Sequence, residues 1–178
     1  MKTIDVIMKE LGAILEGLNE EQYQNLVQKF KEDRRFFFVG EGRSGLIAKA
    51  IAMRLMHSGK QVYVVGETTT PAIEGKDLLI AVSASFKTGN IVQLVNTSIE
   101  TGAEVFVVTT NMKTLETYNG LFINAATKYR KENEPNTIQP LGNQFDQCAH
   151  LILDAAIIDS LKGNHDFSEL KKIHSNLE

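Results

Sequence analysis

The chain has 178 residues, enough for one domain with a buried core and little more. Hydrophobic residues make up 43% and charged residues 23%, an ordinary globular composition, and the formal net charge is −3. Such a chain lacks the positive surface field that would attract nucleic acid or an anionic membrane. No apolar run reaches the ~18 residues of a membrane span, and charges interrupt the N-terminus, so we expect a cytoplasmic protein without a signal peptide.

Two helices are predicted before the first strand. Apolar residues recur at helical spacing from Ile4 to Leu18, and a second helix over 20–32 carries Tyr23 and Phe30 on one side. Helices in this position brace an α/β core or pack against a neighbouring subunit. We therefore assign residues 1–33 to an N-terminal helical segment.

Strands and helices then alternate along the chain. Apolar runs predict strands over 35–39, 61–65, 77–82, 104–109 and 120–125, and helices are expected over 44–58, 88–101, 143–161 and 166–174. Continuous apolar strands separated by helical crossovers indicate a parallel sheet covered on both faces. The predicted fold is a three-layer α/β/α sandwich with five parallel strands. It is one domain over 1–178, with an α/β core over 34–125 and a polar loop, long helix and tail over 126–178.

Two strand-to-helix turns carry the main functional signal. The first runs from Gly40 to Gly45, and the second from Ser83 to Thr88. A helix that starts directly after a buried strand points unpaired N–H groups and the positive end of its dipole at one spot, which stabilises an anion. Two such turns with hydroxyl side chains predict a site for a phosphorylated small molecule.

The first turn leaves other interpretations open. It spells G-x-G-x-x-G, the pattern of dinucleotide-binding turns, and Glu67 lies where a ribose-binding acid is expected. Its glycines are equally explained by a tight turn. In the second turn Ser83, Ser85 and Thr88 crowd the end of a strand where a purely structural sequence would favour apolar residues. Lys87 adds a positive charge there or is simply solvated.

Cysteine and histidine give no sign of a disulfide or a metal site. Cys148 is alone, and its apolar surroundings predict a buried thiol in a reducing compartment. No pair among the four histidines has metal-ligand spacing. His150 is predicted to lie in the core or an interface of the long helix, and His165 to be solvated. We expect no metal and no cofactor.

Further along, five stretches resemble the 6-phospho-3-hexuloisomerases, a branch of the sugar isomerase (SIS) domain family. They occur in the family's order and span nearly the whole chain: GRSGL at 42–46, AMRLMH at 52–57, VGETTTP at 65–71, IQPLG at 138–142 and HSNLE at 174–178. The resemblance implies the fold predicted above and a phosphosugar ligand in place of a dinucleotide.

The resemblance also implies an activity. Members interconvert D-arabino-hex-3-ulose 6-phosphate and fructose 6-phosphate in the ribulose monophosphate route of formaldehyde fixation, through an enediol. This chemistry uses a base and oxyanion-stabilising donors without metal or redox cofactor. Members form homotetramers or dimers, so a homo-oligomer is expected. The rival hypotheses are a non-catalytic phosphosugar-binding module and an isomerase of another phosphosugar.

Site residues follow from the resemblance position by position. Ser44 falls on the first phosphosugar-binding serine, and the second binding loop falls on Ser83, Ala84, Ser85, Phe86, Lys87 and Thr88. Asp146 occupies the place of the family's proton acceptor, a glutamate. Ala84 and Phe86 stand where the family has glycine, and Lys87 where it has an acid.

Four further residues are candidates. Arg43 supports the first loop or meets the anion, and Glu67 contacts a substrate hydroxyl or holds the loop after it. His57 matches a family histidine and either assists proton transfer or interacts with its helix C-terminus. His174 is also matched, and is a candidate for reaching the site of a neighbouring subunit.

Overall fold

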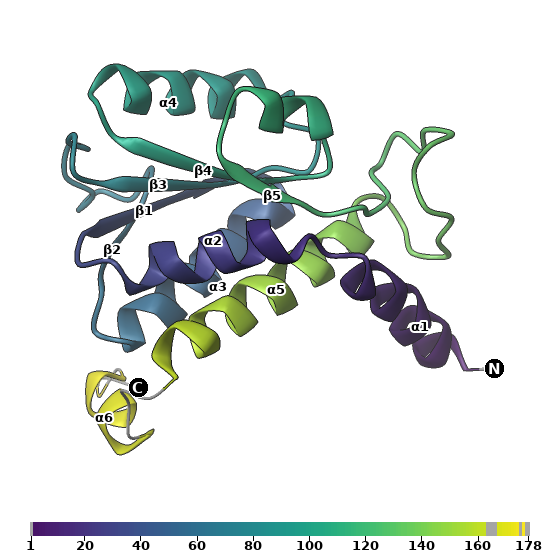
Figure 1. Cartoon of the computed structure of the whole chain (residues 1–178), viewed down its shortest axis with the longest axis horizontal. Coiled ribbons are helices and arrows are strands. Elements are labelled where there is room, and N and C mark those ends of the chain that lie inside the picture. The colour runs from purple at the N-terminus through teal and green to yellow at the C-terminus, as the bar shows by residue number, and fades with distance from the viewer. Residues whose placement is uncertain (1, 163–166, 175, 177–178) are drawn as a thin grey trace.

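The computed structural model describes residues 2–162, 167–174 and 176 (Figure 1). Its elements in chain order are α1 (Thr3–Glu16), α2 (Glu20–Lys31), β1 (Arg35–Gly40), α3 (Gly42–His57), β2 (Gln61–Val64), β3 (Leu78–Val82), α4 (Gly89–Glu100), β4 (Glu104–Thr109), the 3₁₀ helix η1 (Met112–Glu116), β5 (Gly120–Phe122), α5 (Asn143–Leu161) and α6 (Phe167–Ile173).

The five strands form one parallel sheet in the order β2-β1-β3-β4-β5. Its centre is apolar on every position: all five residues of β3 are buried, and Ile80 lies between Phe38 of β1 and Phe106 of β4. A strand with no polar residue must be covered on both faces. The parallel five-stranded sheet predicted from these apolar runs is confirmed.

Alternate strand residues feed two separate cores, which makes the three layers. Phe36, Phe38 and their neighbours pack against α2, α3 and α5, while Phe37 packs with Ile91 and Val95 of α4 on the other face. Figure 1 shows α4, with the short η1 beside it, above the sheet and α2, α3 and α5 together below it. The α/β/α sandwich is therefore confirmed, with one face covered more thickly than the other.

The expected element bounds hold to within three residues. The helix expected from residue 44 begins at Gly42, and the strand expected over 120–125 ends at Phe122. The terminal helix is observed from Phe167, while residues 163–166, including the predicted solvated His165, lie outside the described residues. Within the described part of the chain, no helix is long and apolar enough to cross a membrane.

Two glycines let β1 and α3 meet closely. A Cβ on Gly40 would lie 2.8 Å from the carbonyl oxygen of Ser44, and one on Gly45 would lie 2.7 Å from the carbonyl oxygen of Gly40. Side chains cannot be accommodated against backbone at such distances. The first turn of α3 is thus pressed against the end of β1, which fixes the position of Ser44.

Helix α1 lies beside the polar loop rather than on the sheet. It extends from one corner of the molecule next to the loop at 127–142 (Figure 1). Leu11 and Ile14 are its buried residues and join the core that α5 shares. The N-terminal helices therefore differ: α2 covers the sheet, whereas α1 braces the loop and the start of α5.

Candidate active site

A pocket of about 260 Å³ opens at the carboxyl ends of β1 and β3. The chain leaves β1 toward β2 and leaves β3 toward β4, so the pocket lies where the strand order reverses, the usual binding position in such sheets. Four segments line it, contributing Glu41, Arg43, Ser44, Val82, Ser83, Ala84, Ser85, Thr88, Ile91, Thr127, Lys128, Tyr129, Leu141, Gly142 and Asp146. The two predicted turns thus meet in one pocket.

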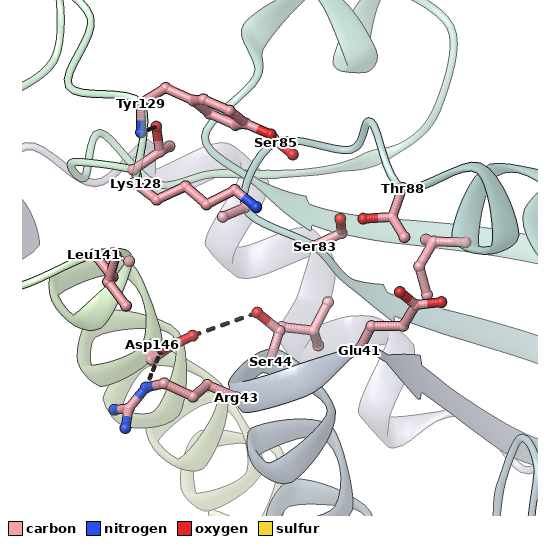
Figure 2. A pocket seen from close by; sticks show the side chains of 15 residues that line it. Glu41, Arg43, Ser44, Ser83, Ser85, Thr88, Lys128, Tyr129, Leu141 and Asp146 are labelled. Atoms are coloured by element: carbon pink, nitrogen blue, oxygen red, sulfur yellow. Dashed lines mark hydrogen bonds and ion pairs between the residues drawn. The ribbon is translucent and has the colours of Figure 1, made fainter.

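Helix N-termini supply donors on both sides of this pocket. Ser44 is the third residue of α3, and Thr88 is the N-cap of α4 with no side-chain cap bond. The first N–H groups of a helix have no partner within the helix, and the dipole adds positive potential. The rim therefore combines backbone donors with the hydroxyls of Ser83, Ser85 and Thr88 (Figure 2).

The second loop is held in place by the end of β4. The carbonyl oxygen of Ala84 accepts hydrogen bonds from the hydroxyls of Thr109 and Thr110, each at 2.9 Å. The amide of Asn111 donates to the carbonyl oxygen of Ser85 at 3.3 Å. Because its carbonyls are tied behind it, the loop presents its hydroxyls to the pocket with little freedom to reorient.

Phe86 and Lys87 belong to this loop but do not line the pocket. Phe86 has a φ of 49° and its buried ring packs against Tyr118, with ring centroids 5.4 Å apart. A left-handed conformation costs a non-glycine residue about 1 kcal/mol, which ring burial offsets. Lys87 is exposed. The loop therefore keeps a backbone suited to glycine, and the Phe86 ring leaves the pocket open.

Asp146 is the buried carboxylate of the pocket, with 4% of its surface exposed. Arg43 donates from Nε to its Oδ2 at 2.7 Å, and the Ser44 hydroxyl donates to its Oδ1 at 3.3 Å (Figure 2). A second guanidinium nitrogen of Arg43 donates to Asn143 at 2.6 Å. The first turns of α3 and α5 thus join a serine, an arginine and a carboxylate in one hydrogen-bonded group.

Sequence reasoning missed the wall formed by Thr127, Lys128 and Tyr129. Lys128 lies with its Nζ 5.2 Å from the Tyr129 ring centre and points across the pocket (Figure 2). Glu134 anchors Thr127 by accepting from its backbone N–H and its hydroxyl, at 2.8 and 2.7 Å. Burial opposes ionisation of Glu134, but these bonds outweigh it and lower the pKa of this carboxyl. The only sequence signal was a polar loop.

Besides Phe86 and Lys87, three further predicted residues lie outside this pocket. His57 is at the far end of α3, about 20 Å from Ser44 by the rise of a helix. There its ring stacks on that of His174, with centroids 4.9 Å apart. Glu67 pairs with Lys49 at 2.6 Å. Within one chain, neither histidine reaches Asp146, and Glu67 does not line the pocket.

Two residues of α5 behave differently from one another. Cys148 is buried as predicted, and burial raises the pKa of its thiol to about 11. His150 is not a core residue: 44% of its side chain is exposed, and its Nε2 lies 3.6 Å from Asp154. The apolar character of α5 comes from residues on its other sides. Among the described residues, no three His, Cys, Asp or Glu side chains are grouped to hold a metal ion.

A hydroxyl-rich pocket at the switch point of a parallel α/β/α sandwich is typical of proteins that bind a small anionic ligand. The SIS domain family matches residues 29–135, and the chain belongs to this family. The resemblance seen in the sequence is therefore confirmed.

Relatives match along nearly the whole chain. An uncharacterized protein of Methanothermobacter thermautotrophicus is 35% identical, with 99% of this chain and 95% of the relative covered. The 3-hexulose-6-phosphate isomerase of Bacillus subtilis is 31% identical, with both chains fully covered. A solved structure from Methanococcus jannaschii, for which a 3-hexulose-6-phosphate isomerase function was inferred, is 28% identical, covers 100% of both chains and has a TM-score of 0.82.

Proposed function

We propose that this protein is a 3-hexulose-6-phosphate isomerase, which interconverts D-arabino-hex-3-ulose 6-phosphate and fructose 6-phosphate. The observation that carries the proposal is the buried carboxylate of Asp146 beside a rim of hydroxyls and helix amides. Full-length similarity to proteins named for this reaction supports it. The assignment to the isomerases and the choice of a phosphosugar as substrate rest on this similarity to 3-hexulose-6-phosphate isomerases.

The phosphate end of the substrate fits the rim. A phosphate monoester carries a charge near −2 at neutral pH and accepts several hydrogen bonds. We assign its binding to Ser83, Ser85 and Thr88 together with the first amides of α4, and the charge of Lys128 to the opposite wall. A dinucleotide is disfavoured because the pocket, at about 260 Å³, is small for a ligand of that size.

The reacting carbons then lie toward Asp146. In the direction of fructose 6-phosphate, its carboxylate takes the proton from C2 while the C3 carbonyl oxygen gains a proton, which gives an enediol. The O2 hydroxyl then loses its proton as C3 gains one, leaving the ketone at C2. The Ser44 hydroxyl and the α3 amides stabilise the oxygen that becomes negative.

Arg43 gives the pocket a cation that can act both in the empty pocket and in the pocket with substrate bound. Its side chain is 61% exposed although it is bonded to Asp146. In the empty pocket it neutralises the carboxylate, and with substrate present it is placed to meet a sugar oxygen. Because the guanidinium has further N–H donors besides the Nε bonded to Asp146, Arg43 can bind the sugar while it still holds the carboxylate in place.

We test the proposal by hydrogen exchange. Fructose 6-phosphate incubated with the protein in D₂O is expected to gain deuterium at C3, because the enediol is reprotonated there from solvent. Deuterium at C1 would instead indicate aldose–ketose isomerisation of another phosphosugar. Binding without exchange would overturn the enzyme in favour of a phosphosugar-binding module, and NAD(H) binding would revive the dinucleotide.

We also propose that the protein forms a homo-oligomer. Large apolar side chains are exposed on the outer sides of α3 and α5, namely Leu46, Met53, Leu151 and Ile158. Two adjacent helices with exposed apolar residues support association through this side. The expectation that His174 reaches a neighbouring subunit's pocket stays a prediction, which sedimentation and a structure of the assembly would test.

A further inference from the structure

Hydrogen bonds run without a break from α1 to Asp146. Gln139 donates from Nε2 to Glu10 at 3.0 Å, and its Oε1 accepts from Asn143 at 2.9 Å. Asn143 in turn accepts from Arg43 at 2.6 Å, and Arg43 donates to Asp146 at 2.7 Å. We call Glu10, Gln139, Asn143 and Arg43 the Glu10 relay. It joins residues more than a hundred positions apart.

Glu10 is firmly held at the start of this relay. It also accepts from the Thr137 hydroxyl at 2.5 Å and from the backbone N–H of Ile138 at 2.9 Å. Burial opposes its ionisation, but these bonds and Gln139 outweigh burial and lower the pKa of its carboxyl. Glu10 is therefore an anion at neutral pH and can only accept hydrogen bonds.

An acceptor at this end fixes the orientation of every later group. Because Glu10 accepts only, Gln139 must turn its NH₂ toward it and its oxygen toward Asn143. Asn143 must then turn its NH₂ toward Gln139 and its oxygen toward Arg43. The guanidinium, a donor only, fits that oxygen and presents its Nε to Asp146. Reversing Asn143 would set its NH₂ against the guanidinium, and reversing Gln139 would set its oxygen against the Glu10 carboxylate and its NH₂ against that of Asn143.

We propose that Glu10 is a positioning residue that sets the orientation of Arg43 and thereby of Asp146. The proposal rests on the proposed function in that Asp146 is the group positioned. Gln139 transmits the orientation well because only 1% of its surface is exposed, so water does not compete for its amide. Helix α1, outside the α/β core, thus supports the chemistry of the pocket.

The test is Glu10→Gln, which keeps the size of the side chain and lets the amides of the relay reverse. We expect kcat for C3 exchange to fall about tenfold with KM within about twofold, because misplacement of the base affects the reacting atoms more than binding. In an Arg43→Ala background the same change should cause no further loss of kcat. An equal loss in both backgrounds would overturn the proposal.

Two control variants separate an effect on the orientation of the relay amides from the mere loss of a hydrogen bond or of stability. Thr137→Val removes one bond to Glu10 and the acceptor of the Gln139 backbone N–H, but leaves the Glu10 carboxylate as an acceptor for the Gln139 side chain, so kcat should stay near that of the parent. Glu104→Gln removes a carboxylate that accepts from Lys29 and Arg34, each at 2.8 Å, near the opposite end of the sheet. It should lower stability without changing kcat. A loss of kcat in Thr137→Val equal to that in Glu10→Gln would overturn the proposal.

A readout without substrate keeps this inference separate from the proposed function. The side-chain Nε–H resonance of Arg43, assigned by its loss in Arg43→Lys, should shift in Glu10→Gln and stay in place in Glu104→Gln. An unmoved resonance in Glu10→Gln overturns the relay whatever the activity. If the parent protein shows no exchange while the resonance moves, the proposed function fails and the relay stands.

Discussion

A buried carboxylate lies near each end of the sheet, but the arginine that pairs with it is exposed to a different extent. At the amino end, Asp77 is almost fully buried and accepts two bonds from Arg35, at 2.8 and 2.6 Å, and one from the N–H of Glu74 at 2.6 Å. At the carboxyl end, Asp146 is equally buried, but its partner Arg43 is largely exposed. The first carboxylate is enclosed by its own protein, and the second faces a pocket.

This difference separates a structural carboxylate from a candidate catalytic one. A buried charge whose bonds are all made within the fold stabilises the fold only while both partners remain. A buried charge that faces a pocket beside an exposed partner is able to act on a ligand. Burial is the same in both places, so the accessibility of the partner is what distinguishes them.

The largest effect is expected at the carboxyl end. Asp146→Asn removes the proposed base, so deuterium incorporation at C3 should fall about 1,000-fold. The free energy of unfolding should change little, because the ion pair with exposed Arg43 contributes less than about 1 kcal/mol. Asp154→Asn on the same helix is the control and should retain the parent rate. Unchanged exchange in Asp146→Asn would remove this residue from the chemistry.

At the amino end the same substitution should act on stability. Asp77→Asn leaves Arg35 without its charged partner and should lower the free energy of unfolding by about 2 kcal/mol. Urea denaturation measures this loss. The kcat of the folded fraction should match that of the parent, since Asp77 and the pocket lie at opposite ends of the strands. A drop in kcat with unchanged stability would break the comparison.

A smaller effect is expected from the lysines around the pocket. Lys128→Ala should raise KM for the phosphosugar about tenfold, the worth of one charged hydrogen bond, with kcat nearly unchanged. Lys87→Ala should leave KM as it is, because Lys87 is exposed outside the pocket lining. Initial rates at several salt concentrations measure both. The reverse ranking would restore the site assigned from the sequence.

The smallest effect concerns Cys148, two residues from Asp146 but turned into the core. With its pKa raised to about 11, only about one thiol in a thousand is ionised at pH 8. Native protein should therefore react negligibly with iodoacetamide, and protein in urea should react at the rate of an ordinary thiol. Mass spectrometry follows the modification. Rapid labelling of native protein would show that this side of α5 is open.

The fold was predictable because its signals are local. Runs such as Leu78–Val82 are apolar at every position, and turns with glycine or hydroxyls follow the strands directly. The same logic placed Ser44, Ser83, Ser85 and Thr88 at one rim, since parallel strands end at the same edge. Asp146 was assigned through family resemblance alone, because nothing local distinguishes it from Asp154.

Other parts of the site depend on contacts that no local pattern records. Lys128 and Tyr129 come from a loop without periodicity, whose path is set by Glu134 within the loop and by Glu10, which is far away in the sequence. The left-handed backbone at Phe86 is set by its buried ring and not by its residue type. By contrast, His57 and Ser44 lie at opposite ends of one predicted helix. The rise per residue of a helix therefore gives their separation from the sequence alone.

In the proposed mechanism the phosphate is bound mainly by the β3–α4 turn while the base arrives on α5, so affinity and turnover are carried by different stretches of the gene. Replacing the carboxylate of Asp146 by an amide would leave a protein that is still expected to bind its sugar. Such a fold gives evolution a short path from a catalyst to a sensor of the same metabolite, and back again.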